Sequence, residues 1–311
     1  MKWKPFTITA EDGTPVTAYK WSQGLLKKPK AVVYIVHGMA EHALRYDDFA
    51  QYLLDNGFSV YSMDLRGHGK TAGTVEKLGF FAEADGWNRM VDDIRVLTRT
   101  GEKENPGLPA VLYGHSMGSI LARCYFIKYG AGLAGFILSG IPARLGFLGP
   151  VGKMIASWEI ARFGTRHPST TLHGMNFGSY NKAFAPNRTD FDWLSRDEER
   201  VNAYRDDPFC GTVFSSSAYR DLLEGAMSLE KRGAFSAIDR NVPVYLFGGD
   251  RDSVSKFGKG LAQAEGTLRG AGVTDVTVKL YRDGRHEMLN ETNRAEVYRD
   301  LLDWLSSRVS P

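Results

Sequence analysis

The sequence of 311 residues contains little cysteine and no long apolar run. Its two cysteines, Cys124 and Cys210, lie far apart and in no CxxC or Cys/His spacing, which argues against a disulfide scaffold. We expect two free thiols in a reducing compartment. No window approaches 18 consecutive apolar residues, and the first residues, MKWKPFTITAEDG, lack the apolar stretch of a signal peptide. These absences predict a cytoplasmic protein.

Clustered positive charge is also missing. The formal net charge is +3, and no run of lysine and arginine is longer than two residues. A nucleic-acid-binding protein needs a clustered basic face, so nucleic acid is not the expected partner. Hydrophobic residues make up 43% and charged residues 24%, as in an ordinary globular chain.

What the sequence does contain is an alternation of apolar runs and amphipathic segments. Two short alternating runs flank Asp12-Gly13, which is typical of a hairpin turn. Beyond this hairpin we expect strands at 31–36, 58–63, 109–114, 133–140, 243–249 and 276–281, and helices at 44–55, 86–100, 117–129, 257–270 and 292–308. Such alternation predicts an α/β fold with a mostly parallel central sheet, helices on both faces and the hairpin at one edge.

The alternation stops over residues 141–235, where periodicity is weak. This segment is too long for a loop without structure of its own. We expect an inserted helical cap, made of short helices, over the carboxyl ends of the strands, where open α/β sheets bind ligands. The core then comprises residues 1–140 and 236–311.

The strongest chemical signal is the GxSxG pentapeptide at 114–118, between an expected strand and an expected helix. That setting is typical of a nucleophile elbow, in which glycines allow the serine to occupy a strained turn. The turn aims the hydroxyl at the substrate, and the helix N-terminus faces the developing oxyanion. Ser116 is therefore the predicted nucleophile.

A serine hydroxyl needs a base, and in this kind of fold the partners follow in the order serine, acid, histidine. His286 lies in a turn between the last expected strand and the last helix, where it can reach across the top of the sheet. The orienting carboxylate is expected after the preceding strand, where Asp250 and Asp252 both fit. Spacing alone does not show which of the two aspartates orients the histidine.

Two backbone N–H groups are needed to bind the oxyanion. Met117, directly after the nucleophile, is expected to supply one. Met39, in the loop after strand 31–36, is expected to supply the other, with Gly38 allowing the chain to fold back. Glu41 is expected to support this loop, and direct contact with substrate is its alternative role. Gly38 and Glu41 are accordingly placed among the expected substrate-site residues.

The remaining core histidines, His42, His68 and His115, have no carboxylate or histidine at metal-binding spacing. We expect them to form hydrogen bonds, and we expect no metal site. His115, inside the pentapeptide, is also expected beside the substrate.

Five motifs together resemble the monoglyceride lipase and lysophospholipase branch of the α/β-hydrolases, which are serine aminopeptidase-type hydrolases. They are HGMAEH (37–42), DLRGHGKT (64–71), GHSMG (114–118), GGDRDSV (248–254) and GRHE (284–287). The resemblance covers the core and is weaker in the insertion, which in that family is a variable cap.

The resemblance implies an α/β-hydrolase fold and a triad of Ser116, Asp252 and His286. The family's G-x-x-D pattern favours Asp252 over Asp250. Its oxyanion donors correspond to Met39 and Met117. It also implies two-step acyl transfer that needs no metal or organic cofactor.

The insertion begins with large apolar residues, whose spacing from Leu148 to Trp158 is helical. Such a helix either packs on the body of the enzyme or forms a lipid-facing cap that touches a membrane surface. Trp158 is expected among the substrate contacts. With the resemblance, this favours a small-molecule acyl ester or monoacyl lipid, either lysophospholipid or monoacylglycerol, as substrate, and peripheral membrane contact through the cap. A small ester or an amide is the alternative substrate, and a non-catalytic ligand-binding homologue is the alternative outside enzymes.

Overall fold

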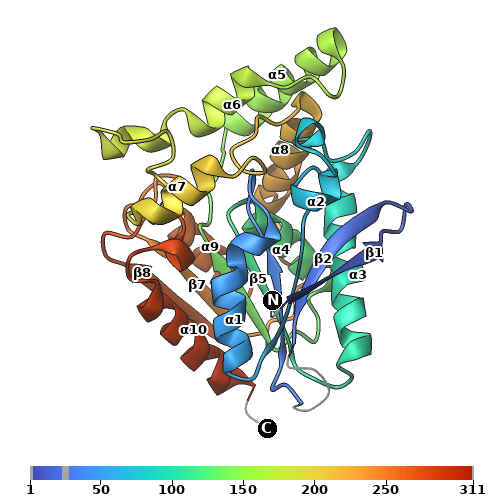
Figure 1. Cartoon of the computed structure of the whole chain (residues 1–311), viewed down its shortest axis with the longest axis vertical. Helices are drawn as coiled ribbons and strands as arrows, with labels where there is room; N and C mark the ends of the chain where they lie inside the picture. Colours follow the sequence, from blue (N-terminus) through green and yellow to red (C-terminus); the bar gives the residue numbers. More distant parts are fainter. Residues whose placement is uncertain (1–2, 23–27, 310–311) are drawn as a thin grey trace.

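The computed structural model describes residues 3–22 and 28–309, which are organised around an eight-stranded sheet (Figure 1). In spatial order the strands are β1 (Trp3–Thr9), β2 (Pro15–Trp21), β4 (Ser59–Met63), β3 (Val32–Val36), β5 (Ala110–His115), β6 (Gly135–Ser139), β7 (Val244–Gly249) and β8 (Val276–Tyr281). β2 pairs antiparallel with both β1 and β4, and the other neighbouring pairs are parallel. The predicted mostly parallel sheet with a hairpin at one edge is confirmed.

Helices cover both faces of this sheet. Those that accompany the strands are α1 (Asp47–Asp55), α2 (Gly69–Ala72), α3 (Gly86–Glu104), α4 (Met117–Tyr129), α9 (Lys259–Gly270) and α10 (Arg294–Arg308). Short 3₁₀ turns lie at η2 (Ala43–Tyr46), η3 (Val75–Lys77) and η5 (Met288–Asn290). The strands beneath them are buried on both faces, since all five residues of β3, β4 and β6 are buried.

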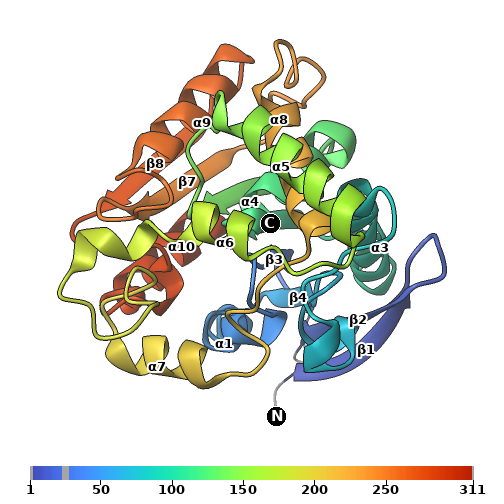
Figure 2. The same ribbon diagram turned by 90° about the horizontal axis from the view of Figure 1, so that it is seen from above.

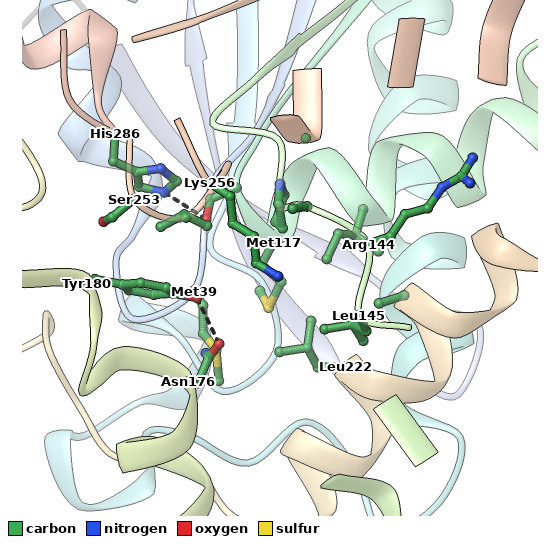
Figure 3. A pocket seen from close by; sticks show the side chains of 18 of the residues that line it. Met39, Met117, Arg144, Leu145, Asn176, Tyr180, Leu222, Ser253, Lys256 and His286 are labelled. Carbon is green, nitrogen blue, oxygen red and sulfur yellow. Dashed lines mark hydrogen bonds between the residues drawn. The ribbon is translucent and has the colours of Figure 1, made fainter. Parts of the chain in front are cut away.

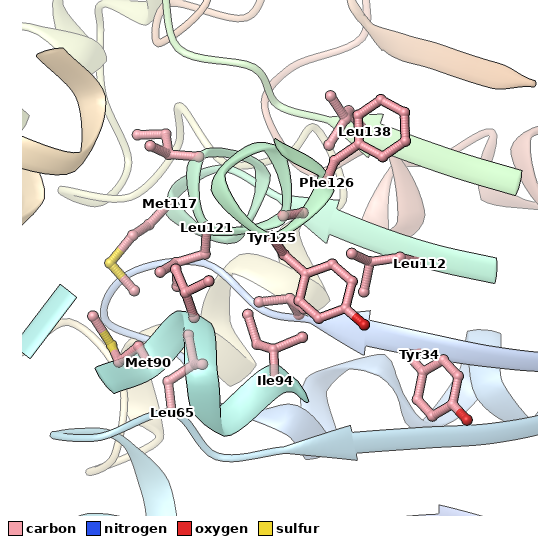
Figure 4. Packing of buried hydrophobic residues seen from close by; sticks show 14 of the residues in the cluster. Tyr34, Leu65, Met90, Ile94, Leu112, Met117, Leu121, Tyr125, Phe126 and Leu138 are labelled. Carbon is pink, nitrogen blue, oxygen red and sulfur yellow. The ribbon is translucent and has the colours of Figure 1, made fainter. Parts of the chain in front are cut away.

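The two faces of the sheet carry separate hydrophobic clusters. Val33 and Ile35 of β3 pack in one cluster with residues of α1 and α10. Tyr34, pointing the opposite way, belongs to the other cluster with α3, α4 and α9. Figure 4 shows Leu121 of α4 and Ile94 of α3 within this second cluster. α4, which begins directly after the predicted nucleophile, is therefore held between the sheet and α3.

The segment 141–235 connects β6 to β7. Its elements are α5 (Leu148–Phe163), α6 (Thr170–Phe177), the 3₁₀ turn η4 (Tyr180–Phe184), α7 (Glu198–Asp206) and α8 (Ser216–Glu230). α5 and α6 lie at the top of the molecule in Figure 1 and cross over α4 and the sheet in the view from above in Figure 2.

The expectation that this segment contains only short helices is wrong. α5 has 16 residues and α8 has 15. The apolar spacing of the sequence did not indicate α8, because the buried face of this helix includes Ser216, Asp221 and Gly225 as well as apolar residues. Through Ala218 and Leu229 it joins the same buried cluster as α3 and α4.

Within residues 3–22 and 28–309, no helix has both the length and the apolar character needed to cross a membrane.

Candidate active site

Ser116 lies in the sharp turn between β5 and α4. Its φ of 52° and ψ of −119° are strained for a residue with a side chain, at a cost of about 1–3 kcal/mol. Its N–H donates to Ser139 O at 3.0 Å, which ties the turn to β6. A Cβ on Gly114 would lie 2.5 Å from Gly118 O, and a Cβ on Gly118 would lie 2.2 Å from Val36 O. The two glycines therefore allow the close approach that forms the turn.

His286 lies between Ser116 and Asp252. Its Nε2 is 2.9 Å from Ser116 Oγ, and its Nδ1 is 3.0 Å from Asp252 Oδ1. An ionised carboxylate accepts the Nδ1–H, which leaves Nε2 free to accept the serine proton. The N–H of Val254 donates to the same Oδ1 at 2.9 Å and holds the carboxylate in place. Asp250 instead occupies a turn, where its N–H donates to Tyr281 O. The structure thus brings Asp252, and not Asp250, to His286.

Burial and charge act on His286 in opposite directions. Burial, the largest single influence, disfavours the imidazolium, but the charge and hydrogen bond of Asp252 together with nearby carboxylates outweigh it, so the pKa of His286 lies above its ordinary value. Glu287 and Glu41 add to the upward shift. A base with a raised pKa has a stronger drive to take the serine proton.

His115 packs against His286 with the ring centroids 4.7 Å apart. Its Nδ1 lies 2.9 Å from Ser139 Oγ. Burial, followed by the positive charge of His286, holds the pKa of His115 well below its ordinary value. His115 is therefore neutral and adds no second positive charge beside His286.

Met39 and Met117 line the same cavity as Ser116 (Figure 3). Met117 begins α4, and the first N–H groups of a helix have no partner inside the helix. Met39 follows Gly38, where a Cβ would lie 3.1 Å from Ser116 Cβ, so this loop passes directly beside Ser116. Both residues lie close to Ser116, and their role as oxyanion donors stays a prediction.

A buried charge network supports residues 37–42, which we name the oxyanion loop. Glu41 Oε1 accepts the N–H of Gly38 at 2.5 Å. Arg45 donates to Glu41 Oε2 at 2.8 Å and, through two N–H groups, to Glu287 at 2.6 and 2.7 Å. Arg45 therefore joins the oxyanion loop to the residue after His286. Sequence reasoning missed Arg45 and Glu287, although Glu41 and Arg45 stand four positions apart and Glu287 adjoins His286.

A cavity of about 610 Å³ opens at Ser116, within the range of small-molecule sites. Loops that follow the strands, together with α4 and α9, form one side of it, and residues of segment 141–235 form the other. Most of its wall is apolar, and the large side chains include Leu145, Leu148, Leu172, Met175, Leu222 and Leu229.

Three of the expected substrate-site residues, Gly38, Glu41 and His115, line this cavity. Trp158 does not, which corrects the expectation for that residue. It lies on α5 with 61% of its surface exposed, whereas the same helix turns Gly152 to the cavity. The two residues are six positions apart, and at about 100° per residue this puts them on different faces of the helix.

Other residues of the cavity had no signal in the sequence. Tyr180 and Trp193, both from segment 141–235, line the cavity, and the Trp193 ring lies 5.2 Å from the His286 ring. Tyr180 donates a hydrogen bond to Asn176 at 3.1 Å, as Figure 3 shows. Aromatic residues in a segment with weak periodicity do not reveal which way they face.

Comparisons of sequence and overall structure show that the chain is similar to known hydrolases. A family model described as serine aminopeptidase, S33, matches residues 27–293. The chain is 29% identical to a monoacylglycerol lipase of Mycolicibacterium smegmatis over 90% of each chain. It is 26% identical to the monoglyceride lipase of Homo sapiens, over 91% of this chain and 84% of that protein. A solved carboxyl esterase from Bacillus coagulans superposes with a TM-score of 0.90 at 26% identity, covering 99% of both chains. The predicted α/β-hydrolase fold is confirmed.

Proposed function

The chain belongs to the serine aminopeptidase S33 family of hydrolases, and we propose that it cleaves carboxylic esters of monoacyl lipids through an acyl-enzyme on Ser116. One observation carries the proposal: two hydrogen bonds lead from Ser116 through His286 to Asp252 beside a large apolar cavity. A nucleophile, a base and an orienting acid are the groups that acyl transfer to serine requires.

In the first step, Ser116 Oγ attacks the ester carbonyl while its proton passes to Nε2 of His286. Asp252 holds the imidazole in the required tautomer and stabilises the imidazolium. The N–H groups of Met39 and Met117 bind the oxyanion, and its collapse expels the alcohol, which receives the proton from Nε2. Water then attacks the acyl-enzyme by the same route, so the fatty acid leaves and the serine is restored.

The cavity supports a long acyl chain as part of the substrate. Its wall is mostly apolar, and Leu148, Leu172 and Leu222 come from three different helices of segment 141–235. Burying apolar surface contributes about 25 cal/mol per Å² to binding, so a long acyl chain should bind more tightly than a short one. The relatives named monoacylglycerol lipase make monoacylglycerol the first substrate to test.

Four cations favour a lysophospholipid as the second substrate to test. The cavity is lined by Arg123, Arg144, Lys182 and Lys256, and none of them forms a salt bridge to a carboxylate within the described residues. Figure 3 shows the Lys256 side chain reaching into the cavity near Met117. Burial lowers the pKa of Arg123 to about 10, so this side chain stays charged at neutral pH. A phosphate on the head group is the complementary charge.

We further propose that residues 141–235 act as a lid that meets lipid surfaces. Phe147, Met154 and Trp158 lie at or along α5 with exposed fractions of 79%, 66% and 61%. Large apolar side chains gathered on one exposed helix are typical of a surface that contacts another apolar phase. Trp158, which does not line the cavity, is assigned to this outer surface.

Cleavage of an amide, which the family's description suggests, is supported less well. A substrate amine needs a free carboxylate, but Glu41 and Glu287 are both paired with Arg45. Glu230, at the cavity wall, accepts the N–H of Leu145 at 2.7 Å. We therefore place esters before amides.

The deciding experiment compares p-nitrophenyl esters from acetate to palmitate with monoolein, lysophosphatidylcholine and an aminoacyl p-nitroanilide. Wild type, Ser116→Ala and the control Ser157→Ala, on the outside of α5, are measured together. We expect turnover of long-chain esters and monoacyl lipid in wild type and control, and none in Ser116→Ala. Activity confined to short esters would contradict a lipid substrate. Anilide cleavage would establish the amide alternative. An inactive but folded wild type would contradict the proposal that the chain is an enzyme.

A further inference from the structure

Three metal-ligating side chains meet where the oxyanion loop contacts segment 141–235. His42 ends the oxyanion loop, and Asp207 and Cys210 follow α7. The imidazole nitrogen, carboxylate oxygen and thiol sulfur all lie within 4.8 Å of one another, and His42 Nε2 is 2.9 Å from Asp207 Oδ2. The side chains of His42 and Asp207 are 16% and 30% exposed, so an ion can reach them from solvent.

The backbone places these side chains before any ion arrives. The N–H of Cys210 donates to Asp207 O at 3.0 Å, and the N–H of Phe209 donates to Asp207 Oδ1 at 2.8 Å. Oδ2 is therefore directed at His42 while Oδ1 is occupied. The N–H of Gly211 donates to Ala40 O at 3.0 Å, which fixes the turn against the oxyanion loop.

The groups beside the trio leave Asp207 available to a cation. One carboxylate oxygen of Asp207 accepts the N–H of Phe209, and the other faces His42. Arg45, the neighbouring guanidinium, is already paired with Glu41 and Glu287.

We infer that His42, Asp207 and Cys210 form a binding site for a zinc ion, with water as the fourth ligand. Nitrogen, oxygen and sulfur donors of this kind are the ones zinc takes. Tetrahedral bonds of about 2.0–2.3 Å separate ligand atoms by about 3.3–3.7 Å, so the trio needs only a small rearrangement. Binding converts the thiol to a thiolate and releases its proton to solvent.

This site lies outside the cavity at Ser116 and goes beyond the proposed hydrolysis. It revises the expectation that His42 has no metal-ligating partner. His42 and Asp207 are 165 positions apart, so their spacing along the chain conceals the contact. A bound ion would link segment 141–235 to the loop that carries Met39.

The test titrates the metal-free full chain with Zn²⁺ by calorimetry and with Co²⁺ by absorption spectroscopy. We expect one equivalent of either ion and a cobalt–thiolate charge-transfer band. Cys210→Ser should abolish the band, and His42→Gln, which removes a ligand, should weaken Zn²⁺ binding by more than the roughly 10-fold that loss of a residue supporting a ligand costs. Cys124→Ser is the matched control, because Cys124 lies on α4 beside Trp87 and away from the trio.

Asp207→Asn provides a second variant that keeps the shape of the turn, because its remaining oxygen still accepts the N–H of Phe209. We expect it to lose Zn²⁺ affinity while its Tm without metal stays near that of wild type. The absence of stoichiometric binding in wild type, a cobalt–thiolate band that survives Cys210→Ser, or a band lost equally in Cys124→Ser would overturn the inference.

Discussion

Arg45 donates two hydrogen bonds to Glu287, of 2.6 and 2.7 Å, and so connects the oxyanion loop to the loop of His286. Glu287 is buried, Arg45 is only 11% exposed, and Arg45 also binds Glu41. We therefore expect the position of Met39 relative to Ser116 to depend on this charge network, which lies outside the proposed acyl transfer.

Replacing Arg45 should impair both stability and turnover. Arg45→Met leaves Glu41 and Glu287 buried without their partner, which costs about 3–5 kcal/mol of folding free energy. A displaced oxyanion loop should also lower kcat by about 100-fold. Thermal unfolding and kcat on a p-nitrophenyl ester check both effects. Arg200→Met, which removes a surface partner of Asp48, should change stability by less than about 1 kcal/mol. An unchanged kcat in folded Arg45→Met would contradict the positioning role.

Changing Asp252 or Asp250 to asparagine should have very different effects on kcat. Asp252→Asn should lower kcat by about 10⁴-fold, because the imidazole then adopts the wrong tautomer. Asp250→Asn should do far less, since Asp250 does not contact His286. Steady-state kinetics on one soluble ester suffice, and a reversed order would assign the acid to Asp250.

The pH dependence of kcat/KM should report His286. Only the neutral imidazole accepts the serine proton, so activity falls as pH decreases through the pKa of His286. Because Asp252 raises that pKa, the midpoint should lie above 6.5. In Asp252→Asn the favourable charge is lost while burial remains, so the midpoint of the residual activity should move to lower pH. Identical acid limbs in the two proteins would contradict this cause.

The same shift has a consequence for stability. A folded-state pKa above the unfolded value means that the pair of His286 and Asp252 contributes most below the unfolded pKa. That contribution is lost as pH rises through the folded pKa. Unfolding free energies of wild type and Asp252→Asn should therefore converge toward higher pH.

Glycine 118 should not tolerate a side chain. Gly118→Ala places a Cβ 2.2 Å from Val36 O, so we expect a loss of more than about 3 kcal/mol or failure to fold. Gly266→Ala is the control, because this position lies in α9 with open space around it and alanine favours the helix by about 1 kcal/mol. Chemical denaturation measures both, and equal effects would contradict the packing argument.

The outer surface of α5 should govern contact with lipid. The double change Met154→Gln and Trp158→Gln should weaken binding to phosphatidylcholine vesicles at least about tenfold, since each side chain contributes about 1.5–3 kcal/mol when fully buried. Hydrolysis of a soluble short ester should stay unchanged, because neither side chain lines the cavity. Leu280→Gln, on β8 and 48% exposed, is the control. Equal vesicle binding by the double variant and wild type would contradict the proposal that α5 contacts lipid.

Much of the core was predictable because its signals are local. α4 spans Met117–Tyr129, as the apolar spacing predicted, and each expected strand appears within two residues of its expected bounds. Ser116 was visible because its strained turn needs glycines on both sides of it. His286 was visible because it follows the last strand.

What escaped prediction depends on contacts between distant segments. Glu287 meets Arg45 across 242 positions, and Asp207 meets His42 across 165. Trp158 was misplaced because an exposed apolar face and a cavity-lining face have the same helical spacing. α8 escaped notice because serine, aspartate and glycine occupy much of its buried side.

The connection between β6 and β7 holds most of the residues that would contact the substrate, whereas the residues that would react with it lie elsewhere in the chain. Ser116, Asp252 and His286 follow β5, β7 and β8, whereas most of the cavity wall opposite them comes from residues 141–235. New substrates can therefore be accommodated by exchanging one segment of the gene while the reacting groups stay as they are. α8 sets the limit of such an exchange, because it packs directly against α3 and α4 of the core, whereas α5 packs on α8. A graft from a relative should therefore join the host chain between α7 and α8 and leave the α8 of the host in place.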